Sequence, residues 1–198
     1  MNERGIIMDE RVVKNHDRFV SLMNSVKREG VDELLKWLES TDFFTAPASR
    51  AYHGAFRGGL CEHSLNVYDE FVRILNAYPE VKADGDSIII AALLHDLCKV
   101  HFYVSEKRNR KNEQGQWESY DAYAIKEKFC YGGHGSKSVY LAQHFIKLTA
   151  DEAIAINCHM SAFGGNVNEV GSAFEYCPFA WLLSVADQAA TYIKEGGK

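Results

Sequence analysis

The sequence predicts a mostly helical, all-α protein: a helical bundle that carries one small β-hairpin. Apolar residues recur at intervals of three and four along most of the 198-residue chain, as on the buried face of an amphipathic helix. Only three prolines occur, and we find no repeat, low-complexity tract or linker-like stretch. A chain of this length should bury roughly 70% of its surface on folding. We therefore expect one compact unit with its own core.

The first half of the chain predicts three amphipathic helices. Two short ones carry the apolar positions of residues 12–26 and 31–38. A longer one runs from about Leu60 to Tyr78, directly after the pair Gly58-Gly59, which indicates a tight entry into the helix.

A fourth helix carries residues 88–98, and its apolar positions nearly encircle the axis, as in a buried central helix. Asp86 or Ser87 is expected to cap it. This helix would contain the adjacent pair His95 and Asp96.

The second half begins with a change of pattern. Apolar and aromatic residues flank the polar run 107–116 between Phe102 and Lys126, which predicts a solvent-exposed β-hairpin. Helical spacing returns over residues 136–148 and again over 150–160, where Thr149 and Glu152 have the spacing of a capping box.

A last helix should follow Pro178, because proline is favoured in the first turn of a helix. We expect a single domain over 1–198, with a core of about 52–192 and an N-terminal helical extension of 1–51.

Composition narrows the classes of function. The formal net charge of −5 argues against a protein that holds a nucleic-acid backbone by bulk positive charge. A small anionic substrate stays possible, because its recognition is local. Residues 1–5 are charged and no signal-like apolar stretch follows them, so we expect a cytoplasmic protein with no membrane partner.

The cysteines indicate neither a disulfide framework nor a thiolate zinc site. They are odd in number, widely spaced and never in a C-x-x-C pair. We expect reduced, mostly buried thiols. The five are Cys61, Cys98, Cys130, Cys158 and Cys177.

Six side chains carry most of the chemical information; they come from five predicted helices, because His95 and Asp96 are adjacent on one of them. Imidazole and carboxylate suit first-row divalent metals, and helical bundles often build such sites from several helices. The mixture favours one or two ions of Mn, Fe, Co, Ni or Zn, with the two oxygens of Asp96 able to bridge a pair. The candidate ligands are His63, His95, Asp96, His134, His159 and Asp187.

Any one of these residues alone is more often an ordinary hydrogen-bonded side chain. His95 and Asp96, however, lie within the strongly apolar run 88–97, where an ionisable group without a partner would be costly to bury. A metal ion is a sufficient partner.

The motifs resemble the HD-domain metal-dependent phosphohydrolase superfamily. The likeness covers about residues 52–192 and is carried by GGLCEHS around His63, LHDLCK around His95-Asp96, and VADQ around Asp187. His134 in GGHG and His159 in NCHM are similar to the two extra histidines of binuclear members, as in the HD domain of 3′-5′ exoribonuclease-like proteins. Cys98 departs from the pattern, because relatives often have glycine there, and we expect it to affect packing more than chemistry.

The resemblance implies one metal held by four side chains and a second that shares Asp96 with two histidines. The first set is His63, His95, Asp96 and Asp187, and the second is Asp96, His134 and His159. It also implies attack of a metal-activated water on phosphorus, with both ions stabilising the developing charge.

Further residues are candidates for the substrate. Lys99 follows His95 by four residues, so a shared helical face would let it reach a metal-bound phosphate and assist Asp96 in catalysis. Arg57 could bind phosphate through two hydrogen bonds, and Lys137 lies at a helix start that favours an anion. Ser136 is expected to be the cap of that helix. His53 resembles a position near the substrate in some relatives.

We therefore expect a metal-dependent phosphohydrolase that acts on a small nucleotide-type phosphate ester or anhydride. A 3′-5′ exoribonuclease-like phosphodiesterase that binds a short oligonucleotide is a competing hypothesis. The basic run 107–111 could contact the oligonucleotide, although a solvated turn is the simpler interpretation. We expect no separate nucleic-acid domain before Tyr52. A di-iron oxygenase of the same fold and a non-catalytic metal-containing binding module are also compatible with the ligand types. The sequence leaves the oligomeric state open.

Overall fold

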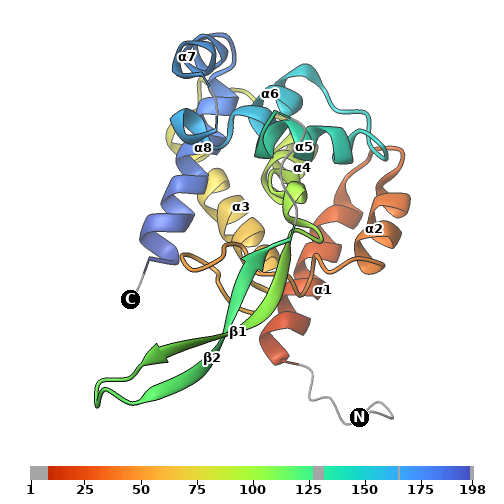
Figure 1. The fold of residues 1–198 in the computed structure, drawn as a ribbon. Helices are drawn as coiled ribbons and strands as arrows, with labels where there is room; N and C mark the ends of the chain where they lie inside the picture. Colours follow the sequence, from red (N-terminus) through yellow and green to blue (C-terminus); the bar gives the residue numbers. More distant parts are fainter. Residues whose placement is uncertain (1–8, 127–131, 165, 197–198) are drawn as a thin grey trace.

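Helices dominate the computed structural model, which describes residues 9–126, 132–164 and 166–196 (Figure 1). The expectations for residues 1–5 and for Cys130 lie outside these residues. The described residues form eight α-helices, a two-stranded hairpin and three short turns of other helical type. The α-helices are α1 Glu10–Ser25, α2 Val31–Glu39, α3 Gly59–Ala77, α4 Gly85–Leu94, α5 His134–Ala142, α6 Ala150–Cys158, α7 Val167–Tyr176 and α8 Pro178–Ala189. The short turns are the 3-10 turns η1 Leu97–Lys99 and η2 Ser161–Phe163 and the π turn η3 Ala190–Lys194.

Helix α4 is the centre of the bundle, as its apolar sequence predicts. It packs against α3, α6 and α1, and α8 packs against α3 and α6 (Figure 1). Opposite sides of α4 face two separate parts of the core. Ile90 and Leu93 pack into the part formed with α1 and α2, whereas Ala91 and Ala92 pack into the part formed with α8. Because α4 is buried on all sides, the residues that follow it, His95 and Asp96, are held in a fixed position.

The end of α4 differs from the prediction in a way that shapes the site. The helix ends at Leu94 and does not continue to Cys98; the chain passes through His95 and Asp96 into η1. The predicted cap was also wrong. Asp84 caps α4, because its side chain accepts hydrogen bonds from both the backbone N–H and the hydroxyl of Ser87.

The later helices agree with the prediction in part. The capping box of Thr149 and Glu152 is present at the start of α6, and Pro178 occupies the first turn of α8. Helix α5 ends at Ala142, well before the predicted end at residue 148, and α7 was not predicted.

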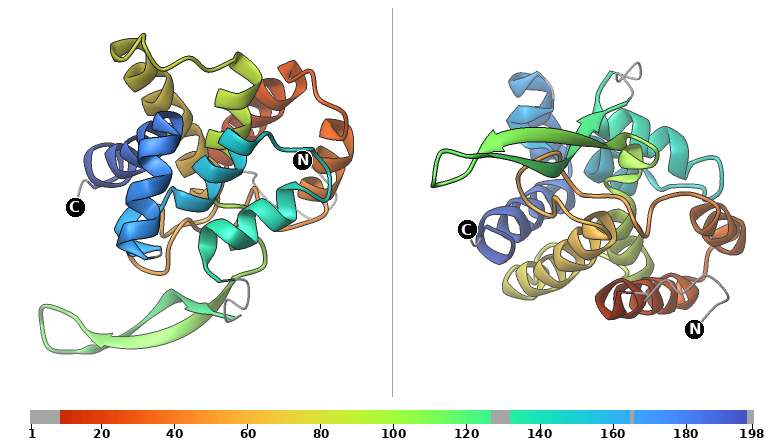
Figure 2. Two further views of the ribbon diagram at one scale, coloured as in Figure 1. Left: turned by 90° about the horizontal axis from the view of Figure 1, so that it is seen from above. Right: turned by 60° about the horizontal axis from the view of Figure 1, so that its bottom comes forward.

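The hairpin is confirmed. Strand β1 (Tyr103–Lys111) pairs antiparallel with β2 (Trp117–Ile125), in a register from Tyr103 opposite Ile125 to Lys111 opposite Trp117. The basic run 107–111 lies in β1 and not in a turn, because the turn is formed by residues 112–116 around the side chain of Asn112. The hairpin leaves the bundle as an arm, seen apart from the helices in the left view of Figure 2.

No helix among the described residues is long and apolar enough to cross a membrane.

Candidate metal centre

The entry to α3 places two histidines side by side. Gly58 has a positive φ of 83°, and a Cβ on Gly59 would lie 2.0 Å from the carbonyl oxygen of Gly54. The glycine pair therefore lets the loop before α3 fold back against the first turn of the helix. As a result the rings of His53 and His63 lie 4.9 Å apart between centroids.

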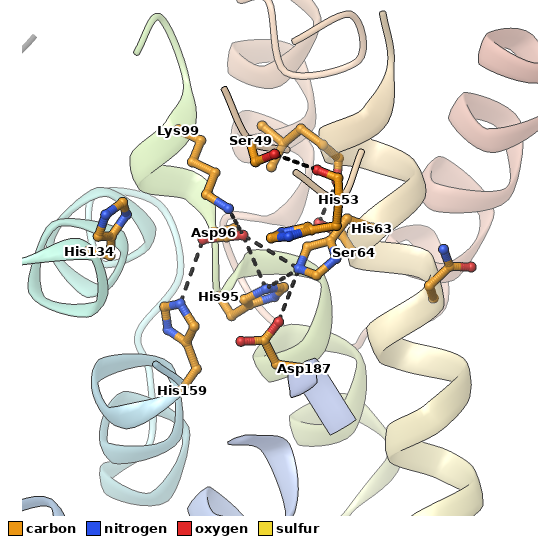
Figure 3. Close-up of polar contacts among 12 residues, drawn as sticks. Ser49, His53, His63, Ser64, His95, Asp96, Lys99, His134, His159 and Asp187 are labelled. Carbon is orange, nitrogen blue, oxygen red and sulfur yellow. Dashed lines mark hydrogen bonds and ion pairs between the residues drawn. The ribbon is translucent and has the colours of Figure 1, made fainter. Parts of the chain in front are cut away.

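Four predicted ligands converge on one point (Figure 3). His63 Nε2 lies 3.1 Å from Asp187 Oδ1, 3.3 Å from His95 Nε2 and 3.6 Å from Asp96 Oδ2. His95 Nε2 lies 3.4 Å from the same Asp96 oxygen. Helices α3 and α8 supply His63 and Asp187, and the break after α4 supplies the other two residues. Donor atoms from distant parts of the chain thus face a common centre.

The histidine tautomers suit metal binding. The Nδ1 atoms of His95 and His159 lie 2.8 and 2.7 Å from the carbonyl oxygens of Ala92 and Ile156. An Nδ1–H donated to each carbonyl leaves Nε2 with a lone pair directed into the site.

His159 provides the test of fit for a second ion. Its Nε2 atom is buried and has no hydrogen-bond partner within the described part of the chain, a costly arrangement for a polar atom. That atom lies 3.6 Å from Asp96 Oδ1, on the side of the carboxylate away from His63. An ion between Asp96 and His159 would satisfy it, so the donor set fits divalent metals on both sides of Asp96.

Electrostatics keeps the two carboxylates ionised. Burial raises the pKa of Asp96, but the positive charge of Lys99 beside it and its contacts with the nearby histidines hold it well below its usual range. Burial also raises the pKa of Asp187, and the bond to His63 reverses that effect. On the far side of Asp96, burial lowers the pKa of His134 to about 4, so its ring is neutral at physiological pH.

Glu195 is a site residue that no sequence pattern indicates. Its Oε1 lies 3.1 Å from His63 Nδ1 and accepts a hydrogen bond from Asn66 Nδ2 at 2.9 Å. Carboxylates that bind the outer nitrogen of a metal-ligating histidine orient the ring and raise its basicity. Glu195 follows η3, in a segment whose sequence has no motif.

Five of the six candidate ligands, all but His95, line a cavity of about 330 Å³. Lys99 lines it too, with its Nζ 2.6 Å from Asp96 Oδ2. This contact arises from the i, i+3 geometry of η1 and not from a helical face shared with His95. The lining residues are Ala48, Ser49, His53, His63, Asp96, Lys99, Tyr103, His134, His159, Met160, Phe163, Asp187, Gln188, Thr191 and Tyr192.

Three of the secondary candidates lie elsewhere. Arg57 is exposed and does not line the cavity. Lys137 is buried, with its Nζ 5.9 Å from the ring centroid of Phe102, and is also absent from the lining. Ser136 does not cap α5, because its hydroxyl donates to Asn157 Oδ1. Among the substrate candidates, His53 and Lys99 line the cavity.

Comparison with known proteins agrees with the motifs. The HD domain family profile matches residues 60–191. The chain therefore belongs to the HD domain family, the superfamily of metal-dependent phosphohydrolases.

One curated relative is the dihydroneopterin 2′,3′-cyclic phosphate phosphodiesterase of Methanocaldococcus jannaschii. It is 33% identical over 83 residues, which are 40% of this chain and 31% of that protein. The chain thus matches less than a third of that relative's length. No solved structure gave a significant match.

Proposed function

We propose that this protein is a metal-dependent phosphohydrolase that cleaves a phosphate ester or anhydride of a small, nucleotide-type substrate. The observation that carries the proposal is the convergence of His63, His95, Asp96 and Asp187 beside the cavity, with the unpartnered His159 Nε2 beyond Asp96. The proposed ligands are those four residues for one ion, and Asp96, His134 and His159 for a second. Mn, Fe, Co, Ni and Zn all suit this donor set.

The side chains of this protein would hold the substrate and its charge. Bound ions would neutralise phosphoryl oxygens and lower the pKa of an attacking water. Lys99 would place its ammonium beside Asp96, where it can also hydrogen bond to a phosphoryl oxygen. His53 packs against His63 with its ring tilted and lines the cavity, so its ring can donate to the substrate or the leaving group.

The cavity supports a substrate with a flat ring. Tyr103, Phe163 and Tyr192 line it, and Phe163 and Tyr192 are largely exposed, at 77% and 68%. Aromatic side chains of this kind can stack on a heterocycle. The archaeal relative is named for a substrate that joins a pterin ring to a 2′,3′-cyclic phosphate. We therefore place cyclic phosphodiesters of small heterocyclic compounds, 2′,3′-cyclic nucleotides among them, first in the substrate class.

The hairpin favours a small substrate over an oligonucleotide. Its cations Lys107, Arg108 and Arg110 pair with Asp121, Glu106 and Glu118. Paired cations contribute little to binding a phosphate backbone, because release of counterions depends on unneutralised Lys and Arg.

The test is a substrate panel with the purified protein loaded in turn with Mn, Co, Ni, Fe and Zn. The panel contains 2′,3′-cyclic nucleotides, nucleoside mono- and triphosphates and a labelled oligonucleotide. We expect hydrolysis of a small ester or anhydride that His95→Ala and Asp187→Ala abolish together with metal binding. Wild-type metal content and rate in both variants would refute the ligand assignment, and hydrolysis of the oligonucleotide alone would refute the substrate class.

A further inference from the structure

Cys98 lies against the ligands on the second side of Asp96. Its side chain is fully buried, and its Sγ is 3.4 Å from His134 Nδ1 and 3.9 Å from Asp96 Oδ1. Asp96, Cys98 and His134 each offer a donor atom within 4.8 Å of the others. A residue expected to affect packing thus presents a sulfur atom to the proposed metal site.

The fold holds this thiol in place. Because α4 ends before Asp96, the chain turns into η1 and brings Cys98 beside α5. The backbone N–H of Cys98 donates to the hydroxyl of Ser138 on α5, the helix that begins with His134. Helix α5 therefore holds the Cys98 thiol and the His134 imidazole next to each other.

A second, independent observation points to the same oxygen of Asp96. The unpartnered His159 Nε2 lies 3.6 Å from Asp96 Oδ1, the oxygen that faces Cys98. Ligands that share a tetrahedral ion lie about 3.3–3.6 Å apart, given metal–nitrogen and metal–sulfur bonds of about 2.0–2.3 Å. The separations of 3.4, 3.6 and 3.9 Å come close to this spacing.

We propose that Cys98 is a thiolate ligand of the second ion, together with Asp96, His134 and His159. This inference rests on the proposed metal site and deepens it. As the sulfur–metal bond forms, the thiol proton leaves for solvent. A sulfur ligand would make this position selective for thiophilic ions, Zn²⁺, Co²⁺ and Cd²⁺, over Mn²⁺, because Mn²⁺ prefers oxygen.

The experiment is Co²⁺ titration of the metal-free protein over residues 1–198, followed by absorption spectroscopy. A cobalt–thiolate bond gives a charge-transfer band in the near ultraviolet, separate from the visible bands that any bound Co²⁺ gives. We expect this band in the wild type with the second equivalent of Co²⁺. Cys98→Ser should lose the band and release one proton fewer, with about 10–100-fold weaker binding of the second Zn²⁺. Its affinity for Mn²⁺ should change far less.

Cys177→Ser is the matched control, because Cys177 is also a buried free thiol but lies in the core beside α8. This variant should keep the charge-transfer band. Two bound Co²⁺ ions without the band in the wild type, or a band that survives Cys98→Ser, would overturn the inference and leave the metal site standing. Absence of any bound Co²⁺ would overturn both the inference and the proposed function.

Discussion

Two charged regions of the molecule, the cavity wall around Asp96 and the β-hairpin, differ sharply in their surroundings. On the hairpin, Lys107 and Asp121 form an ion pair with both side chains about 70% exposed. At the cavity, Asp96 and its neighbours His63, His95 and His159 are at most 2% exposed. Water stabilises the first group whatever its partners, so such pairs contribute less than about 1 kcal/mol. The buried side chains around Asp96 need partners inside the protein, and bound metal ions would supply them.

The largest effect should come from removing the shared carboxylate. Asp96→Asn takes one donor from both proposed ions, so we expect loss of bound metal and a fall of kcat/KM on the order of 10³-fold or more. The metal-free protein should also lose about 3–5 kcal/mol of unfolding free energy, because Lys99 stays buried without its carboxylate. Metal analysis, steady-state kinetics and denaturant unfolding measure the three quantities.

Asp121→Asn is the control from the other region. It removes the carboxylate of an exposed pair, so metal content, rate and stability should all stay close to wild type. An Asp96→Asn protein that retains two ions and wild-type activity would contradict the contrast between the regions.

A smaller effect should follow from Glu195→Gln. The amide can still accept a hydrogen bond from His63 Nδ1, but it loses the negative charge that makes the ring a better ligand. We expect metal affinity to fall by about 10–100-fold with the fold unchanged. Competition titration with a chelator measures the affinity, and Glu195→Asp should recover part of it. If Glu195→Gln and wild type bind equally, Glu195 is not a positioning residue for His63.

The pH dependence of metal binding should reflect the same histidine. Burial lowers the pKa of His63, but the bonds to Asp187 and Glu195 outweigh burial and raise it to about 10 in the metal-free protein. An ion must therefore displace one proton, so affinity should rise about tenfold per pH unit between about pH 6 and 8. The same proton stabilises the metal-free fold fully below about pH 6.5, and that contribution is lost as the pH rises through about 10. A metal affinity independent of pH would refute the proton displacement.

The sequence predicted helix positions better than the way helices end. Periodicity located α1, α2, α3 and α8, because a helix with one apolar face has a strong repeat. The periodicity predicted the wrong end for α4. Leu97 and Cys98 continue the apolar pattern of residues 88–94, so the sequence does not show that the helix ends before His95 and Asp96. The break after α4 directs Asp96 and Lys99 toward the cavity and Cys98 toward His134.

The candidate site shows the same limit. The six ligand candidates could be named from motifs, and the structure brings them together. Glu195 has no motif, and its contact with His63 joins residues 132 positions apart. Arg57 looked suitable because it precedes the glycine pair, but nothing in the sequence shows that its side chain lies outside the cavity. Local patterns indicate residue types, whereas tertiary packing decides which of them meet.

The smallest effect should come from the hairpin itself. Replacing Lys107, Arg108, Arg110 and Lys111 together by alanine removes cations that are exposed and, for the first three, paired with carboxylates. We expect kcat/KM for a small phosphate ester to stay within about twofold of wild type, because these residues do not line the cavity. The hairpin remains folded if the far-ultraviolet circular dichroism spectrum is unchanged. If the variant loses most of its activity on an oligonucleotide but not on the small ester, the hairpin contacts nucleic acid. The hairpin and the buried site would then both take part in substrate binding.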